Sequence, residues 1–188
     1  MNFDEANDIA HCVMNAVAPV CNRIEIAGSI RRRKDIVKDI ELVAQIQSYD
    51  SLFEALQTQG MFIKPGTSEI IAWPPKHGNK YVRMMLPQNI KLDFFIATPH
   101  NWGPLFMMRT GSAAGPHGNP FDGFVPAMFS AWKKVSGGGY MSGCMPTLPD
   151  GTSLVVPEEA DFFELCNVSW IEPQDRISAQ VVKKAIKK

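Results

Sequence analysis

One short segment constrains most strongly what this chain can fold into: a strand, a glycine turn, a basic loop and a second strand. Residues 24–27 and 39–46 are apolar enough to form the two strands, and Gly28-Ser29 begins the turn between them. Backbone N–H groups in such a turn can approach a phosphate closely, because glycine has no side chain. Arg32 follows, and a guanidinium can bind phosphate oxygens bidentately. The segment therefore predicts a phosphate site beside the second strand.

Acidic side chains on the strands extend this arrangement. Asp39 and Glu41 stand two residues apart, so on a strand they point to the same face while Ile40 points to the core. Asp93 offers a third carboxylate within the apolar stretch 90–96, where a lone acid is costly to bury unless it meets a cation. Carboxylate oxygens are ligands that hard divalent cations prefer. The three acids are therefore predicted to hold divalent metal next to a bound triphosphate.

Each of these features alone has an ordinary structural explanation. Glycine-serine turns before basic residues are common, and Asp-x-Glu on a strand is usually a solvated face. The basic run 31–34 alone is typical of an exposed loop. Their conjunction, in this order and followed by an acid on a later strand, has few such explanations.

In this order the motifs resemble those of the nucleotidyltransferase superfamily typified by polymerase beta, and more narrowly of the family X DNA polymerases. The signature of that family is Gly-Ser-x-x-Arg followed by Asp-x-Asp. The run Lys-Leu-Asp at 91–93 resembles the basic-x-Asp strand of the family, and Thr-Gly-Ser at 110–112 resembles its Phe-Thr-Gly-Ser turn. The run Trp-Ile-Glu-Pro-Gln-Asp-Arg at 170–176 is similar to its closing Tyr-x-Glu-Pro-x-x-Arg. The resemblance spans most of residues 24–176.

The resemblance implies an α+β fold. A polymerase beta-like nucleotidyltransferase palm, with a mixed sheet and helices on one face, would cover 1–110. A small thumb-like C-terminal subdomain that contacts nucleotide and DNA would cover 111–188. The implied activity is DNA-directed DNA polymerisation, as in DNA repair, by two-metal transfer of a nucleotidyl group from an NTP or dNTP to a primer 3′-hydroxyl. The implied cofactors are two Mg²⁺ or Mn²⁺ ions, and the implied partner is a DNA primer-template.

The resemblance also implies a role for each residue of the site. Asp39 and Glu41 would bridge the two metals, and Asp93 would lie beside the attacking 3′-hydroxyl. Lys91 would contact the primer terminus. The residues expected to bind the nucleotide are Gly28, Ser29, Arg32, Lys38, Met108, Arg109, Thr110, Gly111 and Ser112.

Several positions depart from the family pattern. Glu41 stands where the polymerases usually have Asp, although the wider superfamily uses Asp-x-Glu. Met108-Arg109 replaces an aromatic pair that discriminates against ribose, which predicts weak sugar selectivity. Val125 and Phe129 fall near positions where the family presents polar side chains to the nascent base pair. These departures predict low fidelity or a template-independent reaction.

Periodicity and turn residues predict the remaining elements. Helices are expected at 4–18, 51–59, 101–108, 121–135 with an early interruption at Pro126, 158–165 and 178–186. Strands are expected at 24–27, 39–46, 61–64, 69–73, 81–86 and 91–97, with a hairpin of 140–145 and 153–156 that turns near 149–151. Residues 113–120, rich in Gly and Pro, are expected to form a loop and look like an insertion.

Composition adds weaker constraints. The chain of 188 residues has 19 basic and 19 acidic residues, so its formal net charge is zero and any nucleic-acid affinity should be modest and salt-sensitive. Local clusters set phosphate contacts, and two exist, at 31–34 and among the lysines at 183–188. The four cysteines show no paired spacing, which favours a reducing intracellular compartment over a zinc site or disulfides. Without a long apolar run or a leader, we expect no membrane association, and we expect a monomer.

The N-terminus has room for one helix before the first motif, so the amino-terminal lyase domain of the family is expected to be missing, as in its compact viral members. Two other classes of function remain open. One is a non-polymerase nucleotidyltransferase that modifies RNA, a small molecule or a protein. The other is a binding module with an inactive site. Metal-dependent incorporation of nucleotide separates the binding module from both enzymes, and the acceptor substrate separates the enzymes from each other.

Overall fold

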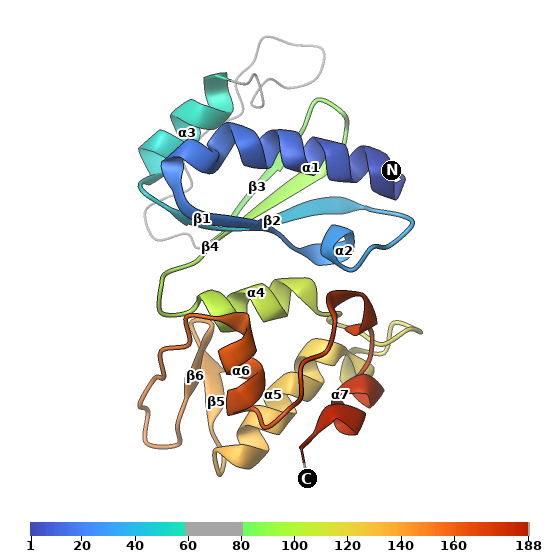
Figure 1. Ribbon diagram of the computed structural model, residues 1–188, viewed down its shortest axis with the longest axis vertical. Coiled ribbons are helices and arrows are strands. Elements are labelled where there is room, and N and C mark those ends of the chain that lie inside the picture. Colours follow the sequence, from blue (N-terminus) through green and yellow to red (C-terminus); the bar gives the residue numbers. More distant parts are fainter. Residues whose placement is uncertain (59–80, 188) are drawn as a thin grey trace. The chain divides into compact units, whose positions relative to one another are not determined.

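The computed structural model describes residues 1–58 and 81–187, which form two compact units that meet in the sequence at Ala97 and Thr98 (Figure 1). The chain is α+β, with a mixed four-stranded sheet in the first unit and helices plus a small hairpin in the second. The division places residues 98–110, expected in the first part, in the second unit. There the Gly103 N–H donates a hydrogen bond to the Val156 carbonyl at 3.1 Å.

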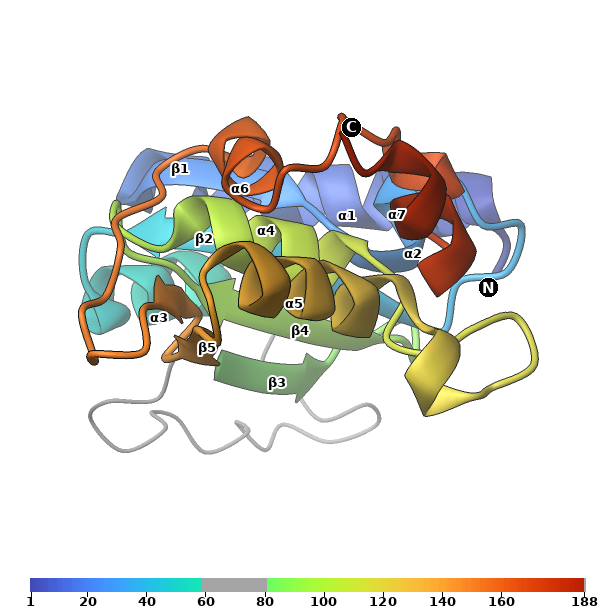
Figure 2. The same ribbon diagram turned by 90° about the horizontal axis from the view of Figure 1, so that it is seen from below.

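The first unit consists of a sheet and the helices that cover it. Its elements are α1 (Phe3–Val17), η1 (Ala18–Val20), β1 (Cys21–Ile26), α2 (Gly28–Arg31), β2 (Asp39–Ile46), α3 (Tyr49–Thr58), β3 (Tyr81–Met85) and β4 (Lys91–Ile96). The strand order is β1-β2-β4-β3 (Figure 2). Strands β2 and β4 run parallel, and the outer two strands pair antiparallel with them.

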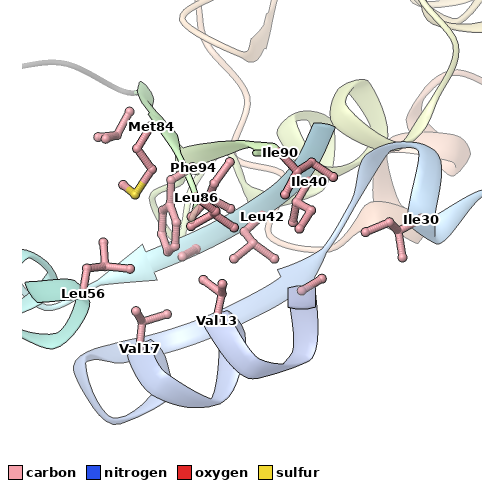
Figure 3. Close-up of a cluster of buried hydrophobic side chains, with 14 of the residues drawn as sticks. Val13, Val17, Ile30, Ile40, Leu42, Leu56, Met84, Leu86, Ile90 and Phe94 are labelled. Carbon is pink, nitrogen blue, oxygen red and sulfur yellow. The ribbon is translucent and has the colours of Figure 1, made fainter. Parts of the chain in front are cut away.

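Helix α1 begins at a capped N-terminus and buries one apolar stripe. The side chain of Asn2 accepts a hydrogen bond from the Glu5 N–H at 2.9 Å, which satisfies one of the free donors of the first turn. Its buried side chains lie three or four residues apart, the spacing of one helix face, and include Val13 and Val17. Figure 3 shows both valines directed toward the sheet, where they pack in one cluster with Leu42 and others. Each fully buried side chain of this size contributes about 1.5–3 kcal/mol.

The second unit has its own apolar core. Its elements are α4 (Trp102–Thr110), η2 (Pro120–Asp122), α5 (Phe124–Val135), β5 (Tyr140–Ser142), β6 (Met145–Thr147), α6 (Glu159–Leu165), η3 (Pro173–Asp175) and α7 (Ala179–Ala185). Met107, Met128, Trp132 and Phe162 lie in this core, so α4, α5 and α6 all contribute to it. None of the helices within the described ranges combines the length and apolar character needed to cross a membrane.

Two expected features differ from the structure. The hairpin pairs residues 140–142 with 145–147, so it turns at Gly143-Cys144, where both residues have positive φ. The expected turn at 149–151 exists, but it leads only to an isolated bridge between Thr147 and Ser153. Pro126 does not interrupt α5, because it is the third helical residue, where the missing N–H would have no partner within the helix. The strands expected at 61–64 and 69–73 lie outside the described residues.

Candidate nucleotide and metal site

Two parallel strands bring the three predicted acids to one face of the sheet. The register of β2 and β4 pairs Glu41 with Asp93, and it pairs Asp39 with Lys91. Ile40, between the two acids of β2, is fully buried in the core under α1. Asp39 and Glu41 are half-buried, whereas Asp93 is only 3% exposed. The acids therefore occupy the face opposite α1, as period-2 alternation requires.

The predicted phosphate turn lies directly against Glu41. The Ala27 N–H donates to the Glu41 carbonyl at 2.8 Å, which ties the end of β1 to β2. Gly28 follows with a φ of 62°, and a Cβ added there would lie 2.1 Å from Glu41 Oε2. A side chain at position 28 would therefore displace the carboxylate. Ser29 Oγ is buried and makes no hydrogen bond to any residue that the structure describes, so a ligand oxygen would satisfy it.

Arg32 follows the one-turn helix α2 and lies close to two of the acids. Burial is the main influence on its guanidinium and lowers its pKa, whereas the charges of Glu41 and then Asp39 raise it. Lys38, also predicted to assist nucleotide binding, is exposed just before β2. Arg32, from the basic loop, therefore lies near Glu41 and Asp39.

The carboxylate of Asp93 is held by two side chains of the edge strand β3. Arg83 donates from Nε to Oδ1 at 2.6 Å and from Nη2 to Oδ2 at 2.7 Å. The Tyr81 hydroxyl donates to Oδ1 at 2.8 Å, and its ring packs on Phe95 with centroids 5.0 Å apart. The hydrogen bonds and charge of Asp93 raise the pKa of Arg83, with a smaller contribution from Asp39. Both oxygens of the buried acid therefore have cationic or hydroxyl partners.

Arg83 and Tyr81 are the residues of this site that sequence reasoning missed. A signal was present, because Tyr-x-Arg at 81–83 alternates like Asp-x-Glu at 39–41 and so places both side chains on one face. The antiparallel register that pairs Arg83 with Asp93 joins two segments across a turn and is not visible in either strand alone. The cation that the burial of Asp93 requires is thus a protein side chain.

Two arginines interact with the acids of this face. Arg32 interacts electrostatically with Glu41 and Asp39, and Arg83 interacts with Asp39 and Asp93. Among the described residues, no three His, Cys, Asp or Glu side chains gather closely enough to form a ready metal site. Carboxylate oxygens nevertheless have the donor chemistry that suits Mg²⁺, and Asp93 would exchange Arg83 and Tyr81 for the ion. A divalent cation at Asp93 would therefore have to displace Arg83 and Tyr81 from its carboxylate.

The predicted nucleotide-binding residues of the second unit take part in packing and backbone hydrogen bonds at the end of α4. A Cβ at Gly111 would lie 2.4 Å from the ring of Phe124, so only glycine fits there. Ser112 receives a hydrogen bond on its carbonyl from the Val125 N–H at 3.0 Å, and its hydroxyl donates to the Ala114 carbonyl. Thr110 is fully buried. The Thr-Gly-Ser turn thus has a structural role within this unit.

Residues at the departures from the family pattern also contribute to packing. Met108 is half-buried against the core of the second unit, and Arg109 is half-buried in the last turn of α4. Val125 belongs to that core, and Phe129 packs against it. The two α5 positions therefore present apolar groups, consistent with the missing polar side chains noted in the sequence.

The closing segment is organised around a buried arginine. Arg176 is fully buried, its Nη1 donates to Glu159, and its Nε donates to the Ile171 carbonyl at 2.9 Å. Its Cζ lies 4.6 Å from the ring centre of Trp170 and 4.8 Å from that of Phe163. The last motif of the chain is therefore part of the interior of the second unit.

No model of a known protein family matches the sequence, and no curated protein does. Function is therefore inferred from the motifs and from the geometry of the first unit.

Proposed function

We propose that the chain is a nucleotidyltransferase of the polymerase beta-like type, and more narrowly a family X-like DNA polymerase. The observation that carries the proposal is the joint placement of the acids and the glycine turn. The register aligns Glu41 with Asp93, and the backbone of Gly28 approaches Glu41 so closely that a Cβ there would displace the carboxylate. A glycine turn in contact with the Glu41 carboxylate, which in turn neighbours Asp93, is an arrangement that suits a metal-bound triphosphate.

Each residue of the first unit has a distinct task in this proposal. Asp39, Glu41 and Asp93 would hold two Mg²⁺ or Mn²⁺ ions. Those ions supply charge neutralisation on the triphosphate and activation of the attacking hydroxyl when bound. Ser29 donates its hydroxyl to a phosphate oxygen, and Arg32 contributes positive charge. Asp93 lies beside the attacking 3′-hydroxyl of a DNA primer.

Lys91, exposed on the same strand face as Asp93, is the proposed contact to the primer terminus. The residues from Met108 to Ser112 keep their predicted role in nucleotide binding, with weak discrimination between ribose and deoxyribose. Because α5 offers apolar groups at Val125 and Phe129, the proposed reaction has low fidelity. The same observation favours a second candidate, a template-independent nucleotidyltransferase acting on RNA, a small molecule or a protein.

Extension of a labelled DNA primer tests the proposal. The reactions contain dNTPs or rNTPs and Mg²⁺ or Mn²⁺, with and without a template strand. The expected result is metal-dependent extension that follows the template, is lost in Asp93→Ala and is kept in Asp35→Ala, which removes an exposed acid of the basic loop. Extension without template dependence would favour the second candidate. Absence of incorporation into any DNA, RNA or protein acceptor would contradict both.

A further inference from the structure

A groove of about 410 Å³ lies between α5 and α7, on the second unit. Small and aliphatic side chains of both helices line most of it, among them Ala127, Ala131 and Val182. Ala131 and Val182 are themselves buried, whereas Ile186, which also lines the groove, is 40% exposed. The volume of the groove falls within the range of about 300–1,000 Å³ that is usual for ligand sites.

The groove is also lined by Phe121, the most exposed large apolar side chain among the described residues, at 88%. Burial of a phenyl ring normally stabilises a fold, and this position forgoes that stabilisation. The turn that carries the ring is well ordered by local contacts, since Asn119 caps η2 by accepting a hydrogen bond from the Phe121 N–H at 3.0 Å. An aromatic ring is thus presented at the groove by a capped turn.

The charged residues lining the groove are both lysines, Lys134 from α5 and Lys183 from α7. No acid is among its described lining residues. The carboxylate of Asp122, next to Phe121, lies against Gly115, which does not line the groove, since a Cβ at Gly115 would lie 2.8 Å from its Oδ2. In a chain of zero net charge, this is a local concentration of positive charge beside an exposed ring.

We propose that this groove binds a single-stranded polynucleotide. A base stacks on the ring of Phe121 and lies over the apolar surface, while Lys134 and Lys183 contact flanking phosphates. Duplex bases are already stacked on their neighbours, so an exposed ring selects an unpaired strand. The groove joins two features that are far apart in the sequence, the segment that follows the 113–120 loop and the C-terminal lysine cluster. Binding here requires no nucleotidyl transfer, so the inference goes beyond the proposed function.

Fluorescence anisotropy of a labelled oligo(dT) of about 12 nucleotides, within the usual site size, tests the inference with the full chain. Loss of one stacked base costs about 1–3 kcal/mol, which corresponds to roughly a 5- to 150-fold weaker Kd for Phe121→Ala. Phe121→Leu keeps an apolar side chain without a π face and should weaken binding nearly as much. An unlabelled RNA strand and a duplex serve as competitors, and only single strands should compete well.

A matched pair of double variants tests the lysines. Lys134→Ala/Lys183→Ala removes the two groove lysines, and Lys133→Ala/Lys184→Ala removes two exposed lysines from the same helices that do not line the groove. The groove pair should lower the salt slope of log K by about 1.4, at roughly 0.7 per phosphate contact in single strands. The control pair should stay close to wild type in both slope and affinity.

Three results would overturn the inference: no oligonucleotide binding by the wild-type chain at low salt, equal losses in the two double variants, or wild-type affinity in Phe121→Leu. The last result would mean that any apolar side chain suffices, as for a peptide partner. Asp39→Ala separates this inference from the proposed function, because it should abolish nucleotide incorporation and leave oligonucleotide affinity unchanged. If the chain binds the oligonucleotide through the groove but shows no transferase activity, this inference holds and the proposed function fails.

Discussion

Arg83 and Asp93 form a two-point ion pair, with Nε on Oδ1 at 2.6 Å and Nη2 on Oδ2 at 2.7 Å. The arginine side chain is 52% exposed, and the acid is 4% exposed. One partner can therefore leave toward water while the other is fixed in the sheet. A divalent cation that binds Asp93 must compete with this arginine for the same two oxygens.

Replacement of Arg83 should strengthen metal binding. In Arg83→Gln the competing charge is gone, so we expect Mn²⁺ to bind on the order of fivefold more tightly or better, as for coupled ligands in general. Electron paramagnetic resonance of free Mn²⁺ measures the affinity without any reaction. Arg33→Gln removes an exposed charge from the basic loop and controls for long-range attraction. Weaker metal binding in Arg83→Gln would show that the arginine positions Asp93 for the ion.

Replacement of Gly28 should damage the site more than the fold. In Gly28→Ala the new Cβ displaces the Glu41 carboxylate, and the positive φ adds about 1–2 kcal/mol of backbone strain. Gly118→Ala is the matched control, because its φ of 76° imposes similar strain in open space. We expect similar losses of unfolding free energy in urea titrations, and loss of nucleotide incorporation in Gly28→Ala alone. Full activity in both variants would contradict the role of Glu41.

Removal of the buried partner of Arg176 should destabilise the second unit strongly. Glu159→Ala leaves a fully buried guanidinium without its carboxylate, which costs about 3–5 kcal/mol. Glu164→Ala, on the same helix, breaks the ion pair of Lys187 with an exposed carboxylate and should cost only about 0–1 kcal/mol. Urea unfolding followed by tryptophan fluorescence compares the two. Equal costs would mean that water reaches Arg176.

Stability should fall at alkaline pH because of a buried thiol. Burial raises the pKa of Cys166 from 9.0 to about 12. A pKa that is higher in the folded chain gives stability that is complete below pH 9, where both states hold the proton, and that is lost as pH rises toward 12. The loss is at most about 1.4 kcal/mol per pH unit for one group. Urea midpoints for wild type and Cys166→Ala across this range should converge as pH rises, and parallel curves would contradict the assignment.

Local patterns in the sequence predicted most elements within a few residues. The helix at 3–17 follows from the spacing of its apolar residues, and β2 coincides with the predicted strand 39–46. The hairpin was predicted in the wrong register. Pro149-Asp150-Gly151 is the stronger turn signal in the sequence, but the chain turns earlier, at Gly143-Cys144. Cys144 adopts a positive φ of 63°, a conformation that a cysteine in the sequence does not predict.

The sequence by itself determined that Asp39 and Glu41 share one face, since alternation along a strand depends on nothing beyond that strand. It also placed glycine where the turn needs a positive φ, at Gly28. Only the tertiary structure decided which cation meets Asp93 and that Arg176 is an interior residue. Both depend on contacts between segments distant in sequence, the register of β3 on β4 and the packing of the closing segment on α6. Such contacts are selected by the packing of a whole unit, so no local pattern encodes them.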